Sequence, residues 1–480
     1  MPRSHRAIGR CDAAKGTVTL GLAPQADRLK LELNNFTNMN HSTQPVTDFI
    51  NLLDPGANLL FNVTPEEAAA AVVSGDAERV RRIDGQFALV VKDGRQVFMA
   101  RSIGRPMRYF LAKQVAGPLL IVAERMDEIY NCLKERGLHT QFHPSYTRMV
   151  PAHHVVRLEI IGCPDPNPVY TRFFTPERNA LSTDLDAIGK AYIAALANEC
   201  QKWLMTIPAD EPIGVLFSGG IDSGAVFLTL YHLMLKSGLS PQRLKAFTLS
   251  VDNGPDADQA HAFLDQLGLS LFLEVVNVDS AAIDYREAIR VIEDYKPLDL
   301  ESATMTLALC KQIRTLYPNW KYLADGDGGD ENLKDYPIEV NTELTIRSVL
   351  NNMMLYQEGW GVDKIKHSLT YSGGQSRGHV RSYAPSRMVG FKGFSPFALP
   401  NVIQVAEGIP FIELTNWDEA ALYALKGEIT RRGVQAITGM DMPVYQKRRF
   451  QAGATNERTF GELFPGDAAT YRTYFNSLYA

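Results

Sequence analysis

The sequence predicts an α/β protein in which an N-terminal α+β sandwich domain precedes a doubly wound parallel-sheet domain with a mostly helical C-terminal part. Short alternating strands separated by turns fill residues 1 to about 180. Strands and helices then alternate from about residue 213 to 336, which is typical of a doubly wound sheet. Beyond Tyr336 the apolar residues recur at helical spacing. We therefore expect two domains, residues 1–182 and 183–480.

In the first domain the clearest feature is a β-hairpin. Two apolar runs, residues 86–91 and 96–100, flank Lys92-Asp93-Gly94-Arg95, and Asp-Gly between such runs favours a tight turn because glycine tolerates a positive φ. A further strand is expected at residues 118–123, and a helix from Met126 to about Arg136.

In the second domain short apolar runs alternate with helical stretches. Thr183-Asp184 can cap the first helix, and a Pro-bounded loop separates that helix from the first strand. The apolar run 213–217 is typical of a buried parallel strand. The other expected strands are 244–251, 271–278 and 320–324, and the expected helices are 186–204, 225–235, 258–267, 285–295 and 303–316.

Composition narrows the class of protein. The 480 residues are 45% hydrophobic and 21% charged, and a net charge of −5 with both signs interspersed gives no reason to expect binding to nucleic acid or an acidic membrane. No uninterrupted apolar run of about 18 residues is present, so we expect a cytoplasmic protein without a membrane span. Five scattered cysteines without a CxxC pair argue against disulfides or structural zinc. They are Cys11, Cys132, Cys163, Cys200 and Cys310.

A glycine-rich loop follows the strand at residues 213–217. Its sequence is Ser218-Gly219-Gly220-Ile221-Asp222-Ser223, and a helix continues beyond it. Two glycines let successive N–H groups face an anion, and the helix N-terminus adds its dipole. The hydroxyls of Ser218 and Ser223 can donate to phosphate oxygens, and Asp222 can hold Mg²⁺ against them. Since no lysine follows the glycines, this is not a Walker A loop.

A second motif, Asp325-Gly326-Asp327-Gly328-Gly329-Asp330-Glu331, follows the expected strand 320–324. Ligands bind at the carboxyl ends of strands in open α/β sheets. Four carboxylates so close together repel one another unless a cation or a chemical task requires them. The alternatives are a solvated acidic turn or a calcium loop, although the spacing does not fit an EF-hand.

The two motifs, in this order and at this spacing, resemble the synthetase domain of the asparagine synthetase family, which includes the β-lactam synthetases. The family's SGGxDS loop matches residues 218–223, and its GEGSDE-type loop matches residues 326–331. The resemblance implies an ATP-pyrophosphatase fold, ATP and Mg²⁺ as cofactors, and Asp222 and Asp330 as ligands of Mg²⁺ and pyrophosphate. Asp327 falls where asparagine synthetases carry a catalytic Glu and β-lactam synthetases a Tyr. By the same resemblance the nucleotide site is lined by Leu216, Ser250 and Gly326.

Two further segments carry the resemblance toward the C-terminus. Residues 446–453 resemble a QKEQFSDG-type segment, and Lys447 matches the lysine that neutralises charge on the α-phosphate and leaving pyrophosphate. The alternative is that Lys447-Arg448-Arg449 is a solvated basic face. Residues 391–397 align with a segment that carries a Glu and an Arg in the family, and in β-lactam synthetases that Glu supports the catalytic Tyr. Here Lys392 stands in place of the Glu and Phe394 in place of the Arg. A rebuilt acceptor pocket is therefore expected.

The first domain resembles the glutaminase domain of the same family, an Ntn-hydrolase-like fold. Residues 84–88 and 100–109 match its structural patterns. Its chemistry requires an N-terminal Cys, whereas residue 2 is Pro2, and the Arg-Gly-Pro-Asp and Asn-Gly-Glu glutamine-pocket motifs are missing. We expect an inactive domain that supports the synthetase domain.

These observations predict a ligase that adenylates a small-molecule carboxylate with ATP, releases pyrophosphate and lets an amine or ammonia form an amide or lactam, in specialised metabolite biosynthesis. Expected partners are the carboxylate and amine substrates alone, with a homodimer kept open as the assembly. Two alternatives remain. One is a glutamine-dependent asparagine synthetase whose Cys11 is exposed by processing, and the other is a non-catalytic ATP-binding partner protein.

Overall fold

A computed structural model describes residues 48–160, 167–336, 338, 344–353, 375–445 and 453–480. Residues Val46–Ala480 cluster as one compact unit. The boundary between residues 182 and 183 stays a prediction.

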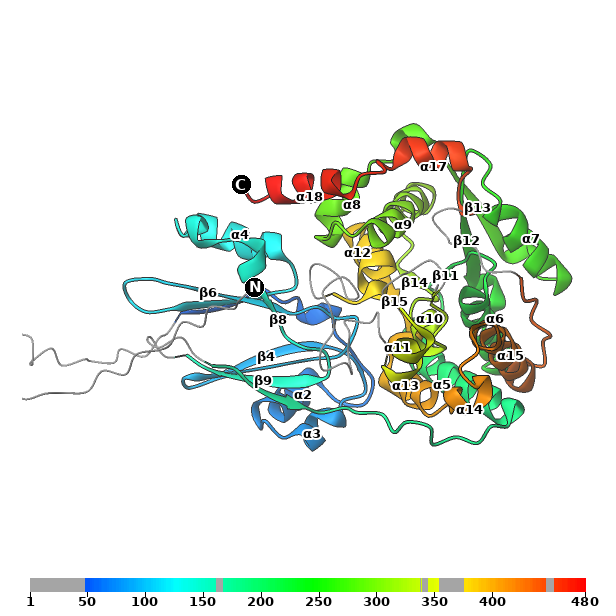
Figure 1. Ribbon diagram of the computed structural model, residues 1–480, viewed down its shortest axis with the longest axis horizontal. Coiled ribbons are helices and arrows are strands. Elements are labelled where there is room, and N and C mark those ends of the chain that lie inside the picture. The colour runs from blue at the N-terminus through cyan, green and yellow to red at the C-terminus, as the bar shows by residue number, and fades with distance from the viewer. Residues whose placement is uncertain (1–47, 161–166, 337, 339–343, 354–374, 446–452) are drawn as a thin grey trace, which may run out of the picture. The chain divides into compact units, whose positions relative to one another are not determined.

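The first part of the chain is a sandwich of two four-stranded sheets (Figure 1). One sheet has the order β1-β7-β6-β8 and the other β10-β9-β5-β4. Their inner faces share one core, in which Val97 and Val156 of one sheet pack with Tyr109 and Leu120 of the other. The strands are β1 (Phe49–Asn51), β4 (Ala88–Asp93), β5 (Gln96–Arg101), β6 (Arg108–Ala112), β7 (Leu119–Ala123), β8 (Arg148–Met149), β9 (His154–Glu159) and β10 (Val169–Arg172), and β2 (Leu59–Leu60) pairs separately with β3 (Gly85–Gln86).

Helices cover the outer faces of this sandwich. Helices α2 (Pro65–Val73) and α3 (Ala77–Arg81) pack on the outer face of the β4–β5–β9 sheet, whereas α4 (Met126–Glu135) packs on β6 and β7. The expected hairpin is confirmed, because β4 and β5 pair antiparallel and Gly94 in their turn has a φ of 56°. The α+β sandwich predicted from the alternating strands is therefore confirmed.

A five-stranded parallel sheet forms the centre of the second part. Its order is β13-β12-β11-β14-β15, so the chain adds β12 and β13 on one side of β11 and then places β14 on the other. Helices cover both faces, which confirms the predicted doubly wound fold: α5, α6 and α15 on one face and α9 on the other. The strands are β11 (Ile213–Leu216), β12 (Leu244–Val251), β13 (Leu273–Val278), β14 (Tyr322–Ala324) and β15 (Lys392–Phe394).

The helices of this part begin and end close to where the sequence predicts, for identifiable reasons. Helix α5 (Leu185–Met205) begins after Asp184, whose carboxylate accepts from the N–H groups of Asp186 and Ala187. Helix α9 (Pro297–Leu316) begins six residues earlier than expected, with proline in its first turn. The remaining helices before β14 are α6 (Ile221–Lys236), α7 (Asp256–Gln266) and α8 (Tyr285–Ile292).

The predicted helical C-terminal part is confirmed, with one addition. The three-residue strand β15 extends the sheet beside β14, although Lys392-Gly393-Phe394 carries no apolar run that would predict a strand. The helices are α10 (Gly329–Asn332), α11 (Ile346–Asn351), α12 (Ala384–Met388), α13 (Pro400–Glu407), α14 (Phe411–Thr415), α15 (Glu419–Thr438), α17 (Glu457–Leu463) and α18 (Ala468–Ser477).

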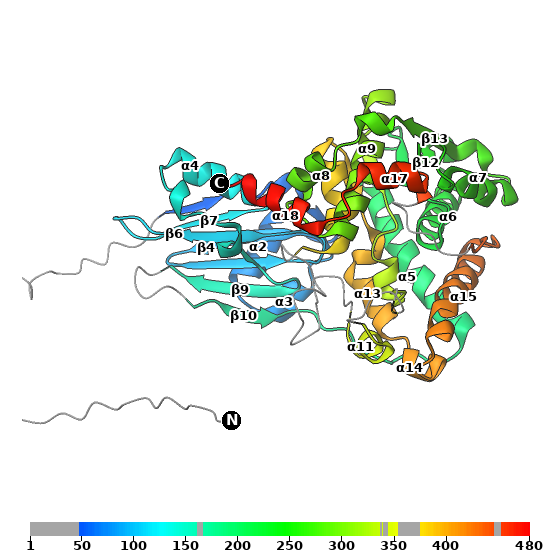
Figure 2. The same ribbon diagram turned by 45° about the horizontal axis from the view of Figure 1, so that its top comes forward.

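The last helix returns to the first part of the chain. In both views α18 lies beside α8 (Figures 1 and 2), and the ring of Tyr479 lies 5.7 Å from that of Tyr130 in α4. Within the described residues, no helix has the length and apolar character that crossing a membrane requires.

Candidate active site

The first element of the site is the loop that joins β11 to α6. Gly219 has a φ of 69°, and a Cβ there would lie 2.8 Å from the backbone nitrogen of Ala260, so both its conformation and its surroundings require glycine. Gly220 is the N-cap of the 16-residue helix α6 and offers no side-chain cap. The loop therefore presents backbone N–H groups and a helix N-terminus, as a phosphate site requires.

Two hydroxyl groups complete this loop. The Oγ atoms of Ser218 and Ser223 lie 3.3 Å apart, and the backbone N–H of Ser218 donates to Ser223 Oγ at 3.2 Å. Ser218 Oγ also accepts from the N–H of Gly220 at 3.3 Å. These contacts place both hydroxyls on the same turn, as the phosphate-binding prediction requires.

The acidic motif lies directly against this loop. A Cβ on Gly326 would lie 2.7 Å from the backbone nitrogen of Ser223, and one on Gly329 would lie 2.2 Å from Asp222 Oδ1. Only glycine allows such close approach. The two motifs meet because β11 and β14 are adjacent parallel strands, so their carboxyl ends share one edge of the sheet at the point where the strand order reverses.

The structure brings the two predicted Mg²⁺ ligands together around a lysine. Lys426 of α15 donates to Asp222 Oδ2 at 2.6 Å and to Asp330 Oδ1, and its Nζ lies 3.3 Å from Asp335 Oδ2. The Lys426 side chain is 4% exposed. Burial alone would lower its pKa, but Asp222, Asp330 and Asp335 outweigh burial and raise the pKa well above the ordinary value. The ammonium therefore stays charged between the two motifs.

Sequence reasoning missed Lys426, although a signal was present. The residue follows Leu422 by four positions and precedes Thr430 by four, so it lies on the face of α15 that packs against α5 and α6. A lysine on a buried helical face is rare unless it has charged partners. Its partners Asp222 and Asp330 lie 204 and 96 residues away in sequence, so no local pattern identifies them.

The four carboxylates of the acidic motif have separate environments. Asp330 pairs with Lys426, whereas Glu331 lies 3.5 Å from Arg377 Nη1. Arg377 and Arg381 both reach the buried Asp299, at 3.4 and 2.8 Å. The carboxylates thus do not share one cation, which resolves the repulsion that their spacing suggests.

The remaining two carboxylates, Asp325 and Asp327, meet at serine hydroxyls. Ser382 Oγ lies 2.9 Å from Asp325 Oδ2 and 2.5 Å from Asp327 Oδ2, and Ser395 Oγ donates to Asp325 Oδ2 at 2.9 Å. Burial raises the pKa of Asp325 to about 6. Burial, followed by the charge of Asp325, also raises the pKa of Asp327 well above its usual range.

The other predicted site residues are placed as follows. Leu216 ends β11 and is partly exposed, and Ser250 lies near the carboxyl end of the neighbouring strand β12, buried and paired in register with Asn277. Lys447, with Arg448 and Arg449, lies outside the described residues. The segment that resumes at Gly453 packs on β12, because Val251 donates to the carbonyl of Ala454 at 2.8 Å.

Neither Lys392, at the position of the supporting Glu, nor Phe394, at the position of the Arg, contacts Asp327 in the described structure. Lys392 is exposed on β15 with its ammonium 5.5 Å from the centre of the Tyr322 ring, and Phe394 is buried against Trp203. The side-chain hydrogen-bond partner of Asp327 is Ser382, which sequence reasoning did not identify.

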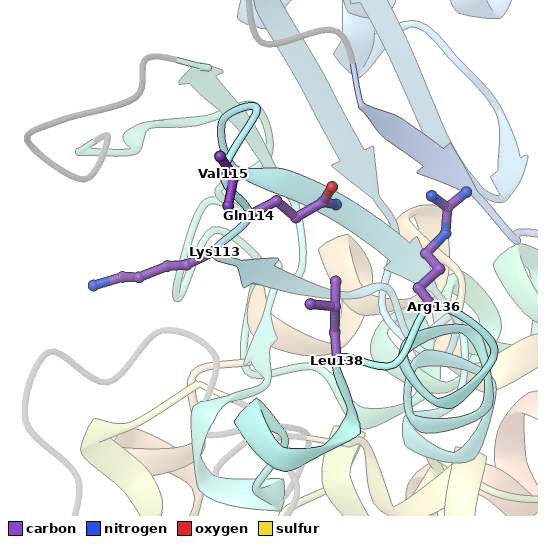
Figure 3. A pocket seen from close by; sticks show the side chains of 5 residues that line it. All are labelled: Lys113, Gln114, Val115, Arg136 and Leu138. Atoms are coloured by element: carbon purple, nitrogen blue, oxygen red, sulfur yellow. The ribbon is translucent and has the colours of Figure 1, made fainter.

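A shallow surface hollow of about 670 Å³ lies elsewhere, on the first part of the chain (Figure 3). Lys113, Gln114, Val115, Arg136 and Leu138 line it, and Figure 3 shows the ends of Lys113 and Arg136 pointing away from each other. It brings no pair of chemical groups together, so the two loops at the sheet edge remain the candidate site.

Comparison with known proteins agrees with this site. Residues 205–381, which include both loops, match the family model of asparagine synthase. The chain is 23% identical to the glutamine-hydrolyzing asparagine synthetase of Pongo abelii over 282 residues, covering 55% of this chain and 47% of that protein. It is 30% identical to the glutamine-hydrolyzing asparagine synthetase 2 of Arabidopsis thaliana over 138 residues, 28% of this chain and 23% of that protein.

The matched stretch covers less than half the length of either curated relative. Among solved structures, the NMN synthetase from Francisella tularensis is 18% identical with a TM-score of 0.22, covering 40% of this chain and 79% of that one.

Proposed function

We propose that the protein is a carbon–nitrogen ligase, because residues 205–381 match the asparagine synthase family model and contain both loops of the site. It adenylates a carboxylate with ATP, releases pyrophosphate, and passes the acyl group to a nitrogen nucleophile. The observation that carries the proposal is the convergence of Asp222 and Asp330, from the two loops, on the buried ammonium of Lys426.

The β- and γ-phosphates of ATP are the groups that this loop suits. The N–H groups at the start of α6 and the hydroxyls of Ser218 and Ser223 supply hydrogen bonds, and the helix dipole favours negative charge there. Leu216, Ser250 and Gly326 would border the nucleoside. Lys426 supplies positive charge where pyrophosphate develops as it leaves.

Magnesium fits the same carboxylates. Mg²⁺ is usually bound by one or two carboxylates together with substrate phosphates, and Asp222 and Asp330 approach each other closely enough to share one ammonium. When bound, the cation would neutralise charge on the pyrophosphate. Among the described residues, no three or more His, Cys, Asp or Glu side chains are grouped so that they could hold a metal ion. The proposed Mg²⁺ would therefore depend on the phosphates of ATP for further ligands.

For the second half-reaction we propose Asp327 as the base that accepts a proton from the attacking nitrogen. Asp327 is partly exposed and accepts a hydrogen bond from the buried hydroxyl of Ser382, whereas Asp330, the other partly exposed carboxylate of the loop, is paired with the ammonium of Lys426. Lys447 would add charge at the α-phosphate. Because the expected glutamine-pocket motifs are missing, the nitrogen would come from an amine or ammonia rather than from glutamine.

The substrate is proposed to belong to a specialised biosynthetic pathway. The positions at which the family's acceptor pocket carries Glu and Arg hold Lys392 and Phe394, one exposed and one in the core. The departure from the family pattern at both positions favours a carboxylate other than aspartate.

The test is pyrophosphate exchange into ATP during a screen of carboxylic acids with Mg²⁺. We expect exchange that depends on one class of acid, is lost in Asp222→Ala and survives in Asp265→Ala, an exposed carboxylate on α7. Release of inorganic phosphate instead of pyrophosphate would refute the adenylation chemistry.

The same screen separates the two alternatives. Exchange with aspartate, followed by glutamine-dependent asparagine formation and a mature N-terminus at Cys11 by mass spectrometry, would identify an asparagine synthetase. Tight ATP binding without exchange for any acid would identify a non-catalytic binding protein.

A further inference from the structure

Ser382 lies between two carboxylates that come from the same loop. Its Oγ is 2.9 Å from Asp325 Oδ2, 2.5 Å from Asp327 Oδ2 and 3.2 Å from the carbonyl oxygen of Gly378. Asp325 receives further hydrogen bonds, from Ser395 Oγ to Oδ2 and from the N–H of Asp327 to Oδ1. The two carboxyl groups are therefore joined through one hydroxyl.

A hydroxyl group has a single hydrogen to donate. Ser382 can satisfy only one of the two carboxylates as a donor, so its contact with the other requires that carboxyl group to donate to Ser382 Oγ. The Asp325–Ser382–Asp327 unit is thus complete only when it carries one carboxyl proton. This requirement follows from the contacts themselves.

The two ends of the unit differ in their access to solvent. Asp325 is 5% exposed, and Ser395, its second hydroxyl partner, is also 5% exposed, whereas Asp327 is only partly buried. A cavity of about 10 Å³, lined in part by Ser395, Gly378 and His379, borders the inner end. Space of this size holds at most one water molecule. Asp325, at 5% exposed, is itself almost entirely shielded from bulk solvent.

The charged groups that face the unit come from neighbouring elements. Arg381, on the same helical turn as Ser382, and Glu331 of α10 act on Asp327 with opposite sign. From α9 the buried thiol of Cys310 faces Asp325, and burial and the charge of Asp325 both raise the pKa of this thiol. Among the described residues, neither Asp325 nor Asp327 forms an ion pair with a lysine or arginine within 4 Å, so beyond the influence of Arg381 on Asp327 a shared proton is needed to balance the second negative charge.

The segment that carries Ser382 is fixed by the first part of the chain. Ser382 lies on the π-helical turn His379–Tyr383. The hydroxyl of Tyr383 accepts from Arg105 Nη1 at 2.5 Å, and His379 Nδ1 lies 3.3 Å from the carbonyl oxygen of Gly104. π-Helical turns are rare and occur frequently at functional sites. The position of the hydroxyl thus depends on contacts made from both sides.

We propose that Ser382 is a proton-relay residue that connects Asp327, the base facing the substrate, with Asp325 in the interior. This inference rests on the proposed function. Before attack, the proton of Asp327 passes to Ser382 Oγ while the hydroxyl proton passes to Asp325, and Asp327 becomes a carboxylate. The nitrogen lone pair then forms the C–N bond, the bond from the acyl carbon to the AMP oxygen breaks, AMP leaves with that electron pair, and the N–H proton goes to Asp327. Asp327, the partly exposed end, releases this second proton to solvent, and the relay runs back to restore the starting state.

The experiment separates the two half-reactions of Ser382→Ala. Adenylation is measured by pyrophosphate exchange with the acid found in the screen, and acyl transfer is measured with ammonia and, separately, with hydroxylamine. Hydroxylamine is unprotonated at neutral pH and attacks acyl-adenylates with less need of a base. We expect unchanged exchange, unchanged hydroxamate formation, and at least a tenfold loss of amide formation with ammonia.

Three further variants define the outcome. Ser382→Thr keeps the hydroxyl, so amide formation and its pH profile should match the wild type. Asp325→Asn leaves the Ser382 hydroxyl in place and should show the same loss of amide formation with ammonia. Ser386→Ala removes a buried hydroxyl one turn further along, which donates to the carbonyl of Tyr383, and this variant should behave as wild type. An equal loss with ammonia and hydroxylamine, or an unmoved pH profile in Ser382→Ala, would overturn the relay. Absence of exchange in the wild type would instead refute the proposed function.

Discussion

Replacing Lys426 with methionine tests the central arrangement of the site. The substitution keeps most of the side-chain volume and removes the charge that Asp222, Asp330 and Asp335 surround. Removal of one partner from a buried ion pair costs about 3–5 kcal/mol. Since Asp222 and Asp330 remain 20% and 29% exposed, solvent relieves part of this cost, and we expect a loss of about 2–3 kcal/mol in the free energy of unfolding.

Magnesium should reverse much of this loss. In Lys426→Met the two carboxylates face each other without the ammonium, so a divalent cation can bind between them. A ligand at about 100 times its Kd contributes about 2.7 kcal/mol. Urea unfolding at neutral pH, followed by circular dichroism with EDTA or with MgCl₂, measures both effects. Because the pKa of Lys426 is raised, its ammonium contributes fully to the free energy of unfolding below about pH 10, and this contribution is lost only above that pH. Neutral pH is therefore suitable for the unfolding measurement.

The matched control is Lys245→Met. Lys245 pairs with Glu274 at 2.6 Å, but the two side chains are 30% and 29% exposed. We expect a loss below about 1 kcal/mol and no response to magnesium. The assignment of Lys426 as the cation between the carboxylates would be wrong if Lys426→Met were as stable as wild type within about 0.5 kcal/mol. It would also be wrong if magnesium stabilised Lys426→Met and Lys245→Met equally.

Two other predictions concern the acidic loop. Gly326→Ala places a Cβ 2.7 Å from the backbone nitrogen of Ser223, so pyrophosphate exchange should fall at least tenfold, whereas Gly461→Ala on α17, where nothing lies within 4 Å, should leave exchange unchanged. The pKa of Asp325 is raised to about 6, so between pH 4 and pH 6 the native state keeps a proton that the unfolded chain has released. The free energy of unfolding should therefore fall by up to about 3 kcal/mol as the pH rises from 4 to 7. Urea titrations of Asp325→Asn at the two pH values should lack this part of the fall.

The sequence predicted the sheet from local patterns, and the resemblance of the two loops to one family implied that they serve one site. An apolar run ending in glycine and carboxylate marks the carboxyl end of a parallel strand, and such ends share an edge. Ser218 to Ser223 and Asp325 to Glu331 needed no knowledge of distant contacts. Strand β15 was not predicted, since three residues with a central glycine pair only because β14 offers an open edge.

Lys426 and Ser382 depend instead on distant packing. Lys426 follows Leu425 in a helix whose charged residues mostly reach solvent, and only the fold shows that α15 turns this position toward Asp222. Ser382 precedes a tyrosine in a segment without helical periodicity, and its π-helical turn is fixed by Arg105, 278 residues before Tyr383. The functional meaning of both residues lies in partners that no local window contains.

The acidic loop then has an interpretation that its sequence alone did not give. Alternating glycines let the backbone turn at each step, so neighbouring carboxylates point to different partners: Asp330 to Lys426, Glu331 to Arg377, and Asp325 and Asp327 to Ser382. An acyl-adenylate reaction needs two separate things: stabilisation of the negative charge on the phosphates, and removal of a proton from the attacking nitrogen. A loop of seven residues can address both only if its carboxylates do not share one cation. We therefore expect Lys426→Met to disturb adenylation, and Ser382→Ala to disturb only the transfer that follows.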